Sequence, residues 1–185
     1  MARVLIVGGG CRGLDLAHAL CAQGHAVRVT TRKAERRTSI ERAGVQCWVG
    51  DPDRIATLRY ALENVTVVCW MLATASGTPD AVAALHGSRL RFMLGQVIDT
   101  TVRGFLYEAA GSVAPAQLAD GAAMVATIAA RNAIPHRVLD VDPARRGPWL
   151  TAARAGVDEL LAPSGPALLE SASGRAPARS LVDRF

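Results

Sequence analysis

The stretch Arg3-Val-Leu-Ile-Val-Gly-Gly-Gly-Cys-Arg-Gly13 decides the fold of this chain. Its first five residues are almost all aliphatic, as in a strand buried on both faces of a parallel sheet. The glycines that follow match the spacing G-x-G-x-x-G at Gly8, Gly10 and Gly13. Over residues 11–23 apolar side chains recur at helical spacing. The stretch therefore predicts a strand, a tight turn and a helix, the opening of a βαβ unit.

Each glycine of this turn has its own expected role. Gly8 allows the tight turn, Gly10 lets the backbone approach a pyrophosphate, and Gly13 lets the helix pack closely on the strand. The free N–H groups at Cys11 and Arg12, at the positive end of the helix dipole, would hold the phosphates. We therefore expect a dinucleotide here, and the alternative is a glycine-rich turn without a ligand.

Outward from this unit, apolar runs alternate with amphipathic stretches, which is typical of a doubly wound parallel sheet. We expect an α/β Rossmann fold of about six strands in the order 3-2-1-4-5-6. The expected strands are 3–7, 26–30, 45–49, 65–72, 103–108 and 137–141. The expected helices are about 11–23, 33–43, 53–62, 78–95, 115–132 and 149–161.

The domain organisation follows from composition. Residues 1–162 are expected to form one dinucleotide-binding domain. Beyond them the sequence turns to Ser, Gly, Pro, Ala and Arg, so 163–185 is expected to be a poorly ordered tail. The apolar start is too short for a membrane span and lacks the pattern of a signal peptide, which favours a cytoplasmic protein without a membrane partner.

The net charge of +5 lies entirely in residues 1–60, which hold ten Lys and Arg against five Asp and Glu. A phosphate-rich small ligand accounts for that asymmetry. Nucleic acid is not expected, because no recognised motif occurs and aromatic residues make up only 4% of the chain.

The cysteines and histidines predict no metal site, because none has metal-ligand spacing. The four cysteines are interpreted as small buried hydrophobes. Cys11 is the exception, since it lies at a predicted helix N-terminus where a thiolate is favoured. The four histidines are each interpreted as surface or capping residues.

The end of the second expected strand bears on the type of cofactor. Enzymes that use NAD place an Asp or Glu there for the ribose 2′-hydroxyl, whereas this chain has Thr30-Thr31-Arg32-Lys33. Arg32 can meet a 2′-phosphate with its guanidinium, and Thr31 can add a hydrogen bond. Arg12 could reach the same phosphate. We therefore expect NADP, with NAD still possible. In the alternative interpretation, Arg32 and Lys33 only begin a solvated helix.

Two longer strings, GHAVRVTTR at 24–32 and AGVQCWVGDPDRIATLRYALENVTVVCWMLA at 43–73, carry a family resemblance. They resemble the atypical short-chain dehydrogenases/reductases, a group that includes NAD(P)-binding, epimerase-like and NmrA-like proteins. The resemblance covers about residues 3–75 well. It implies that Asp51 lies beside the adenine. It also implies that Leu72 and Ala73 line the cofactor near its riboses.

The usual catalytic pair of that group, Tyr-x-x-x-Lys, is missing. The only lysine is Lys33, and Tyr60 and Tyr107 are followed four residues on by asparagine and glycine. Glu108 and Ser112, at the end of the fifth strand, are weak catalytic candidates that could face the nicotinamide. In the alternative interpretation Tyr107 packs in the core and Glu108 makes a structural hydrogen bond.

Two functions stay open. The first is an NADP-dependent reductase or epimerase-like oxidoreductase with a non-standard proton donor. The second is a non-catalytic dinucleotide-binding module that senses redox state or regulates a partner. The sequence leaves open whether the chain is an enzyme, which small molecule or protein it meets, and whether it forms a homo-oligomer.

Overall fold

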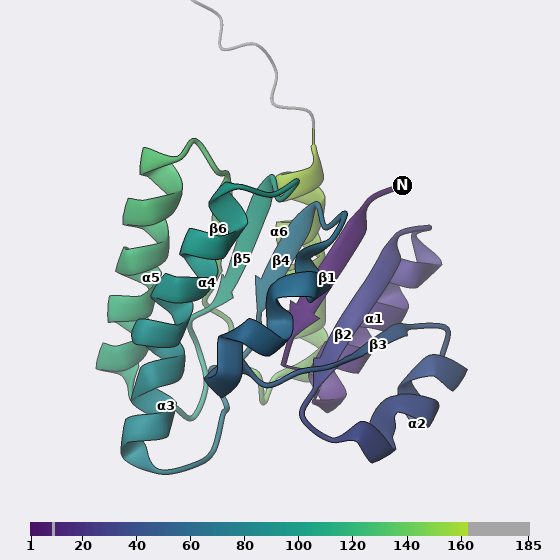
Figure 1. Ribbon diagram of the computed structural model, residues 1–185, viewed down its shortest axis with the longest axis horizontal. Helices are drawn as coiled ribbons and strands as arrows, with labels where there is room; N and C mark the ends of the chain where they lie inside the picture. Colours follow the sequence, from purple (N-terminus) through teal and green to yellow (C-terminus); the bar gives the residue numbers. More distant parts are fainter. Residues whose placement is uncertain (9, 163–185) are drawn as a thin grey trace, which may run out of the picture.

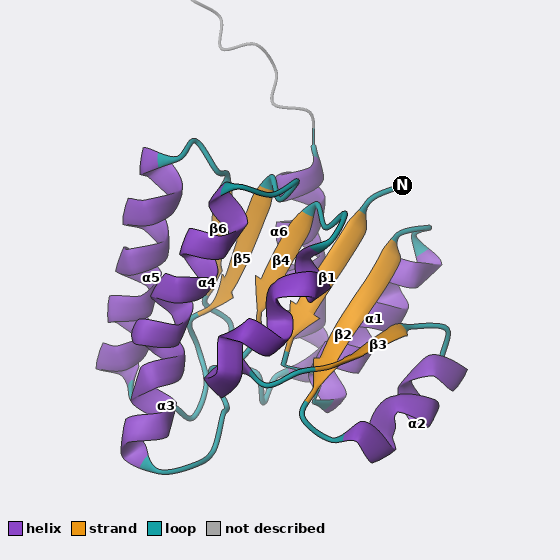
Figure 2. Cartoon of the chain, in the orientation of Figure 1, coloured by secondary structure: helices purple, strands orange, loops and turns teal. Residues whose placement is uncertain are grey.

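A computed structural model describes residues 1–8 and 10–162, and the expected tail at 163–185 lies outside them. At the centre is a six-stranded sheet with the order β3-β2-β1-β4-β5-β6, in which every neighbouring pair is parallel (Figures 1 and 2). The predicted fold class and strand order are confirmed. The strands are β1 Arg3–Val7, β2 Ala26–Thr31, β3 Gln46–Val49, β4 Val67–Trp70, β5 Gly104–Glu108 and β6 His136–Leu139.

Helices cover both faces of the sheet (Figure 1). One face packs against α1 Cys11–Ala22, α2 Arg37–Arg42 and α6 Arg146–Leu161. The other packs against η2 Pro52–Leu62, α3 Pro79–His86, α4 Ser88–Ile98 and α5 Pro115–Arg131. A short 3-10 helix, η1 Ala34–Arg36, links β2 to α2.

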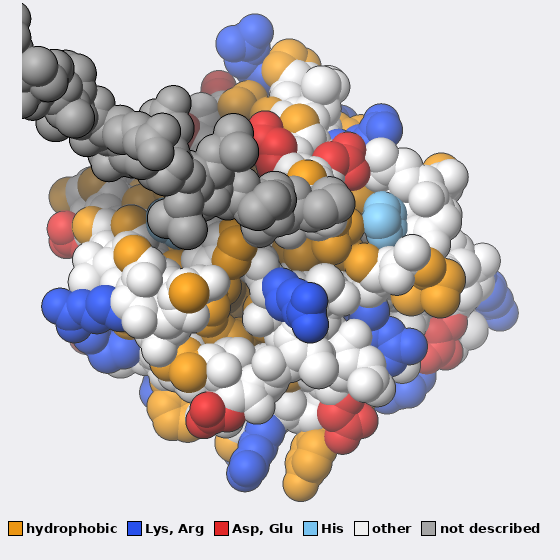
Figure 3. Space-filling model, turned by 90° about the horizontal axis from the view of Figure 1, so that it is seen from above, with side chains coloured by type: hydrophobic (Ala, Val, Ile, Leu, Met, Phe, Trp, Pro, Cys, Tyr) orange, Lys and Arg blue, Asp and Glu red, His pale blue; other side chains and the backbone are white. Residues whose placement is uncertain are grey.

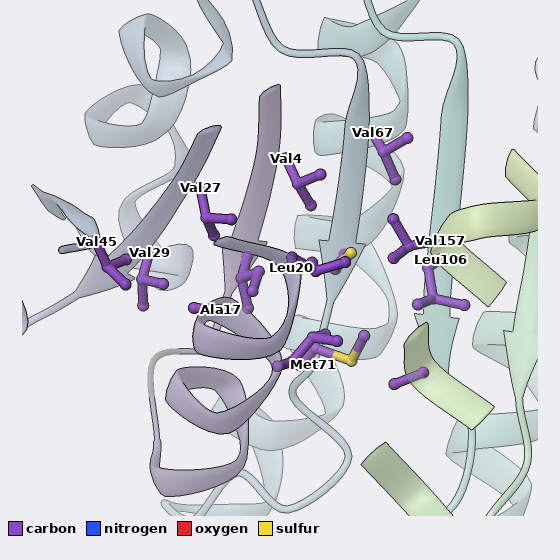
Figure 4. Packing of buried hydrophobic residues seen from close by; sticks show 14 of the residues in the cluster. Val4, Ala17, Leu20, Val27, Val29, Val45, Val67, Met71, Leu106 and Val157 are labelled. Atoms are coloured by element: carbon purple, nitrogen blue, oxygen red, sulfur yellow. The ribbon is translucent and has the colours of Figure 1, made fainter. Parts of the chain in front are cut away.

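Alternation along the strands builds the two cores. In β1, Val4 and Ile6 belong to the core beneath α1 and α6, while Leu5 and Val7 belong to the opposite one. Successive side chains of a strand point to opposite faces, so a strand buried on both sides must be apolar throughout. Figure 4 shows the first core, where side chains from several strands converge on Leu20 of α1.

Four helix predictions need correction. The helix expected at 53–62 is the 3-10 helix η2, which begins at Pro52 and contains the non-helical residue Arg54. The single helix expected at 78–95 is two helices, because Gly87 takes a non-helical conformation (φ −111°, ψ −102°) between α3 and α4. The helix expected at 33–43 begins with the 3-10 turn η1 and becomes α-helical only at α2. The last helix starts at Arg146 rather than 149, since a proline is tolerated within the first turn.

The strand expected at 65–72 is shorter than its apolar run. β4 pairs with β1 only as far as Trp70, whose partner is Val7, the last residue of β1. After Val7 the chain turns into the glycine loop, so β1 has no further residue that can pair with β4. Met71 and Leu72 are nevertheless buried, so the run continues as core packing rather than as strand.

One buried cation links the sheet to η2. Arg28 of β2 is 4% exposed. Its guanidinium donates to the main-chain carbonyls of Tyr60 and Ala61, at the end of η2, and to Oε1 of Gln46 at 3.1 Å. It also lies over the ring of Trp48, 5.4 Å from the centroid. Because a buried charge requires such partners, Arg28 fixes η2 against β2 and β3.

Charged side chains of both signs are distributed over the uncovered part of the face in Figure 3. Within 1–8 and 10–162, no helix has both the length and the apolar character needed to cross a bilayer.

Candidate functional site

The three motif glycines, Gly8, Gly10 and Gly13, differ in whether the fold itself requires a glycine at that position. Gly8 has φ +110°, and a Cβ there would lie 2.2 Å from the carbonyl oxygen of Met71. A Cβ on Gly13 would lie 2.5 Å from the carbonyl oxygen of Gly8. A Cβ on Gly10 would meet nothing within 4 Å, and its backbone is extended (φ −68°, ψ −176°). The fold therefore requires Gly8 and Gly13, whereas Gly10 opens onto free space.

The first turn of α1 is left free for an anion. Gly10 is the N-cap, none of the side chains that the structure describes caps the helix, and no acidic residue stands in its first turn. The N–H groups at such a helix start are unsatisfied within the helix and carry the positive end of its dipole. Cys11 and Arg12 occupy this turn, as predicted.

These residues open onto a cavity of about 440 Å³ at the carboxyl ends of the strands. Most of the predicted cofactor residues line it: Gly8, Gly10, Cys11, Arg12, Gly13, Thr31, Arg32, Asp51 and Leu72. Ala73 does not line it and is fully buried. In parallel α/β sheets ligands bind at this edge, so the predicted residues converge where a ligand is expected.

One end of the cavity is basic. Arg32, Lys33 and Arg36 line it where β2 passes into η1, and Arg32 and Lys33 are exposed. Thr31 is buried, and its hydroxyl accepts the N–H of Lys33 at 3.2 Å, which shapes the turn. Arg36 is absent from the residues predicted from sequence. It lies at the end of the 3-10 helix η1, four residues after Arg32.

The wall beside this basic end is the start of η2. The carboxylate of Asp51 caps that helix by accepting the N–H of Asp53 at 3.0 Å. The N–H of Asp51 in turn donates to the hydroxyl of Thr57 at 2.8 Å. Asp51 is thus held in place just after β3 and lines the cavity beside Pro52, while its expected contact with an adenine stays a prediction.

The opposite end of the cavity contains a buried polar network. Glu108, at the end of β5, is 0% exposed and accepts the N–H of Ala73 and the indole N–H of Trp149, both at 3.0 Å. Nη2 of Arg12 lies 3.5 Å from Glu108 Oε1 and donates to the hydroxyl of Thr74 at 2.7 Å. The guanidinium also stacks over Trp149. Four separate segments therefore meet at one carboxylate.

This network corrects the suggestion that Arg12 reaches a 2′-phosphate. Its guanidinium points toward β4 and β5, whereas Arg32 follows β2, on the other side of β1. The attraction of Glu108 and the ring of Trp149 accounts for that direction. Sequence reasoning missed Thr74 and Trp149, which also line the cavity, because no local pattern connects α6 to the glycine loop.

Neither weak catalytic candidate lines the cavity. Glu108 lies beneath it, and Ser112 is exposed in the loop after β5. Burial raises the pKa of Glu108, and the charge of Arg12 together with its hydrogen bonds opposes that rise. The structural alternative for Glu108, a hydrogen-bonding role, matches these contacts.

Tyr107 and His86 form a second buried pair, outside the cavity lining. Nε2 of His86 lies 3.2 Å from the carbonyl of Leu72, so it carries a proton, and Nδ1 accepts the hydroxyl of Tyr107 at 2.7 Å. Burial raises the pKa of Tyr107 and lowers the pKa of His86. Tyr107 packs in the core, as the alternative interpretation of the sequence holds. His86 is only 2% exposed, so its prediction as a surface residue is wrong.

The His86 pair predicts a pH dependence of stability. Burial lowers the pKa of His86 below its ordinary value of 6.5. Just below pH 6.5, His86 is therefore protonated in the unfolded chain but still neutral in the folded one. The free energy of unfolding should therefore fall as the pH drops below 6.5. The substitution His86→Leu should lower the free energy of unfolding by about 1–3 kcal/mol at pH 8, because it leaves the buried hydroxyl of Tyr107 without an acceptor. The difference in free energy of unfolding between this variant and the unsubstituted protein should become smaller as the pH falls below 6.5.

Urea denaturation of both proteins across this pH range measures the effect. His18→Gln, on the exposed face of α1, is the matched control and should follow the unsubstituted protein. A deficit of His86→Leu that stays constant with pH would contradict a neutral buried imidazole.

The fold and the cavity define a dinucleotide-binding Rossmann protein. The chain belongs to the NAD(P)H-binding family, whose model matches residues 8–165. This confirms the resemblance to NAD(P)-binding proteins. A comparison with curated proteins gives no match.

Solved structures share the fold. A short-chain dehydrogenase/reductase superfamily protein from Agrobacterium tumefaciens with bound NAD is 17% identical, with a TM-score of 0.61 over 85% of this chain and 61% of that one. UDP-glucuronic acid 4-epimerase from Bacillus cereus in complex with NAD is 15% identical, with a TM-score of 0.60 over 74% and 54%. Vestitone reductase from alfalfa is 17% identical, with a TM-score of 0.58 over 75% and 56%. This chain thus spans little more than half the length of these proteins.

Proposed function

We propose that this protein binds NADP(H) in preference to NAD(H), with the 2′-phosphate at Arg32, Lys33 and Arg36. The observation that carries the proposal is the charge at the end of β2. Three cations line the cavity there, and no carboxylate stands at that strand end. A guanidinium forms paired, charge-assisted hydrogen bonds with phosphate oxygens, whereas it has no matched partner in a ribose hydroxyl.

The position of the 2′-phosphate determines where the other parts of the dinucleotide lie in the proposed binding mode. Its pyrophosphate lies at the first turn of α1, against the open side of Gly10. Its adenine lies toward Asp51 and Pro52, at the start of η2. Its other half extends past β4 toward Thr74 and Trp149, so the ligand spans the cavity from its basic end to the buried network.

A binding module is the second candidate function, and one observation favours it over an oxidoreductase. Among the lining residues that the structure describes there is no tyrosine, histidine or glutamate, while Asp51 and Asp53 lie at the adenine end. Carbonyl reduction needs a proton as well as a hydride, and the buried Tyr107 and Glu108 do not reach the cavity. Tight NADPH binding without consumption of NADPH across a set of carbonyl compounds would support the module. Steady turnover would support the oxidoreductase.

Calorimetric titration of the unsubstituted protein with NADP and NAD tests the proposed cofactor. A charge-assisted contact worth about 1.5–3 kcal/mol corresponds to a preference of roughly ten- to a hundredfold for NADP. Because Arg32 and Lys33 are exposed, the preference should shrink as salt is raised. Equal or tighter binding of NAD would overturn the assignment of NADP.

A further inference from the structure

The ion pair of Arg12 and Glu108 places two opposite charges unequally with respect to the cavity. The Arg12 side chain lines the cavity and is 27% exposed, whereas Glu108 is 0% exposed and lies behind it. The cation is therefore the nearer of the two charges for any ligand on the β4 side.

Both charges are held in fixed positions. Each carboxylate oxygen of Glu108 accepts one N–H, from Ala73 and from Trp149. The guanidinium of Arg12 is held between the hydroxyl of Thr74 and the Trp149 ring. A charge pair fixed in this way acts as a permanent dipole, and it acts without reorganising when a ligand arrives.

The nicotinamide half of NADP(H) extends to this side of the cavity in the proposed binding mode. The oxidised nicotinamide ring carries a positive charge and the reduced ring carries none, while the rest of the dinucleotide is the same in both forms. A fixed charge near the ring therefore changes the relative affinity for the two redox states.

We propose that the Arg12–Glu108 pair sets the preference of this cavity for reduced over oxidised dinucleotide, and this rests on the proposed function. Arg12, the nearer charge, repels the oxidised ring and so favours NADPH. Glu108 partly cancels that repulsion and keeps the preference moderate. The pair is thus a redox-selectivity element of the site, with Arg12 as the discriminating group and Glu108 as its positioning and compensating residue.

The test is the ratio of dissociation constants, that for NADP⁺ divided by that for NADPH, in variants of the two residues. Any weakening that affects both forms equally cancels in this ratio. Glu108→Gln leaves the cation uncompensated and should raise the ratio roughly tenfold, as for a unit charge about 10 Å away at an effective dielectric constant of about 20. Arg12→Met should lower the ratio below that of the unsubstituted protein, and Arg12→Lys should keep it near that value.

Tyr107→Phe is the matched control, because it removes a buried hydrogen bond of the residue next to Glu108 in β5 and leaves both charges and their partners in place. Its ratio should stay with that of the unsubstituted protein, and a change as large as that of Glu108→Gln would overturn the proposal by showing that packing is responsible. Should Glu108→Gln fail to fold, the comparison of Arg12→Met with Arg12→Lys still decides.

The inference would be overturned if the ratio of dissociation constants agreed within about twofold in all these variants. It would also be overturned if Glu108→Gln lowered that ratio. If the protein keeps its preference for NADP over NAD while the redox ratio does not move, only this inference fails. If neither redox form binds, the proposed function itself fails.

Discussion

Replacing Arg32 with alanine is expected to remove most of the preference for NADP over NAD and to leave the affinity for NAD nearly unchanged. NADP loses a charge-assisted contact with its 2′-phosphate, a contact that NAD never makes. The affinity for NADP should fall roughly ten- to a hundredfold, and calorimetric titration of both cofactors measures it. Arg36 lines the same end of the cavity, so the preference should shrink further in the double variant Arg32→Ala/Arg36→Ala, in which Lys33 is the cation that remains there.

Arg42→Ala is the matched control for this charge change. Arg42 is an exposed arginine at the end of α2, outside the cavity lining, so its loss should leave both affinities unchanged. An Arg32→Ala variant that binds both cofactors equally less well would show that Arg32 supports the turn rather than the phosphate.

Replacing Gly10 with valine is expected to weaken dinucleotide binding by more than about tenfold while the fold survives. The extended backbone of Gly10 suits any residue, and a Cβ there would meet no atom within 4 Å among the described residues. The added side chain would therefore occupy space that the pyrophosphate needs. Titration gives the affinity, and thermal melting followed by circular dichroism shows whether the fold is retained.

Gly95→Val controls for the general cost of replacing glycine by a β-branched residue. Gly95 lies in α4, away from the cavity, and its Cβ would also meet nothing within 4 Å. Gly95→Val should bind dinucleotide normally. Unchanged affinity in Gly10→Val would place the ligand elsewhere, and a large fall in its melting temperature would give Gly10 a structural role.

The strands and their order could be predicted from the sequence because both depend on local patterns. Aliphatic runs such as Arg3–Val7 identify buried strands, and the right-handed crossover then restricts the order in which parallel strands assemble. The break at Gly87 was missed because an apolar helical pattern continues on both sides of it, and the glycine alone does not show the change in backbone direction.

In the candidate site, too, local patterns predict some residues and tertiary contacts determine the others. The glycine loop and Arg32 follow from spacing within one βαβ unit, and the cavity brings them together. The direction of the Arg12 side chain did not follow, because its partners Glu108 and Trp149 come from the far half of the chain. His86 was misread for the same reason, since only the tertiary structure places it against Tyr107.

The anchoring of η2 by Arg28 has a consequence for the entropy of binding. The wall formed by Asp51 and Pro52 begins the helix whose far end Arg28 holds to the sheet. A ligand that meets a wall already fixed does not have to order it, and the ordering of loops and side chains is a principal cost of association. This end of the cavity is therefore preorganised, and the free energy of a ligand's contacts there goes into affinity rather than into immobilising the protein.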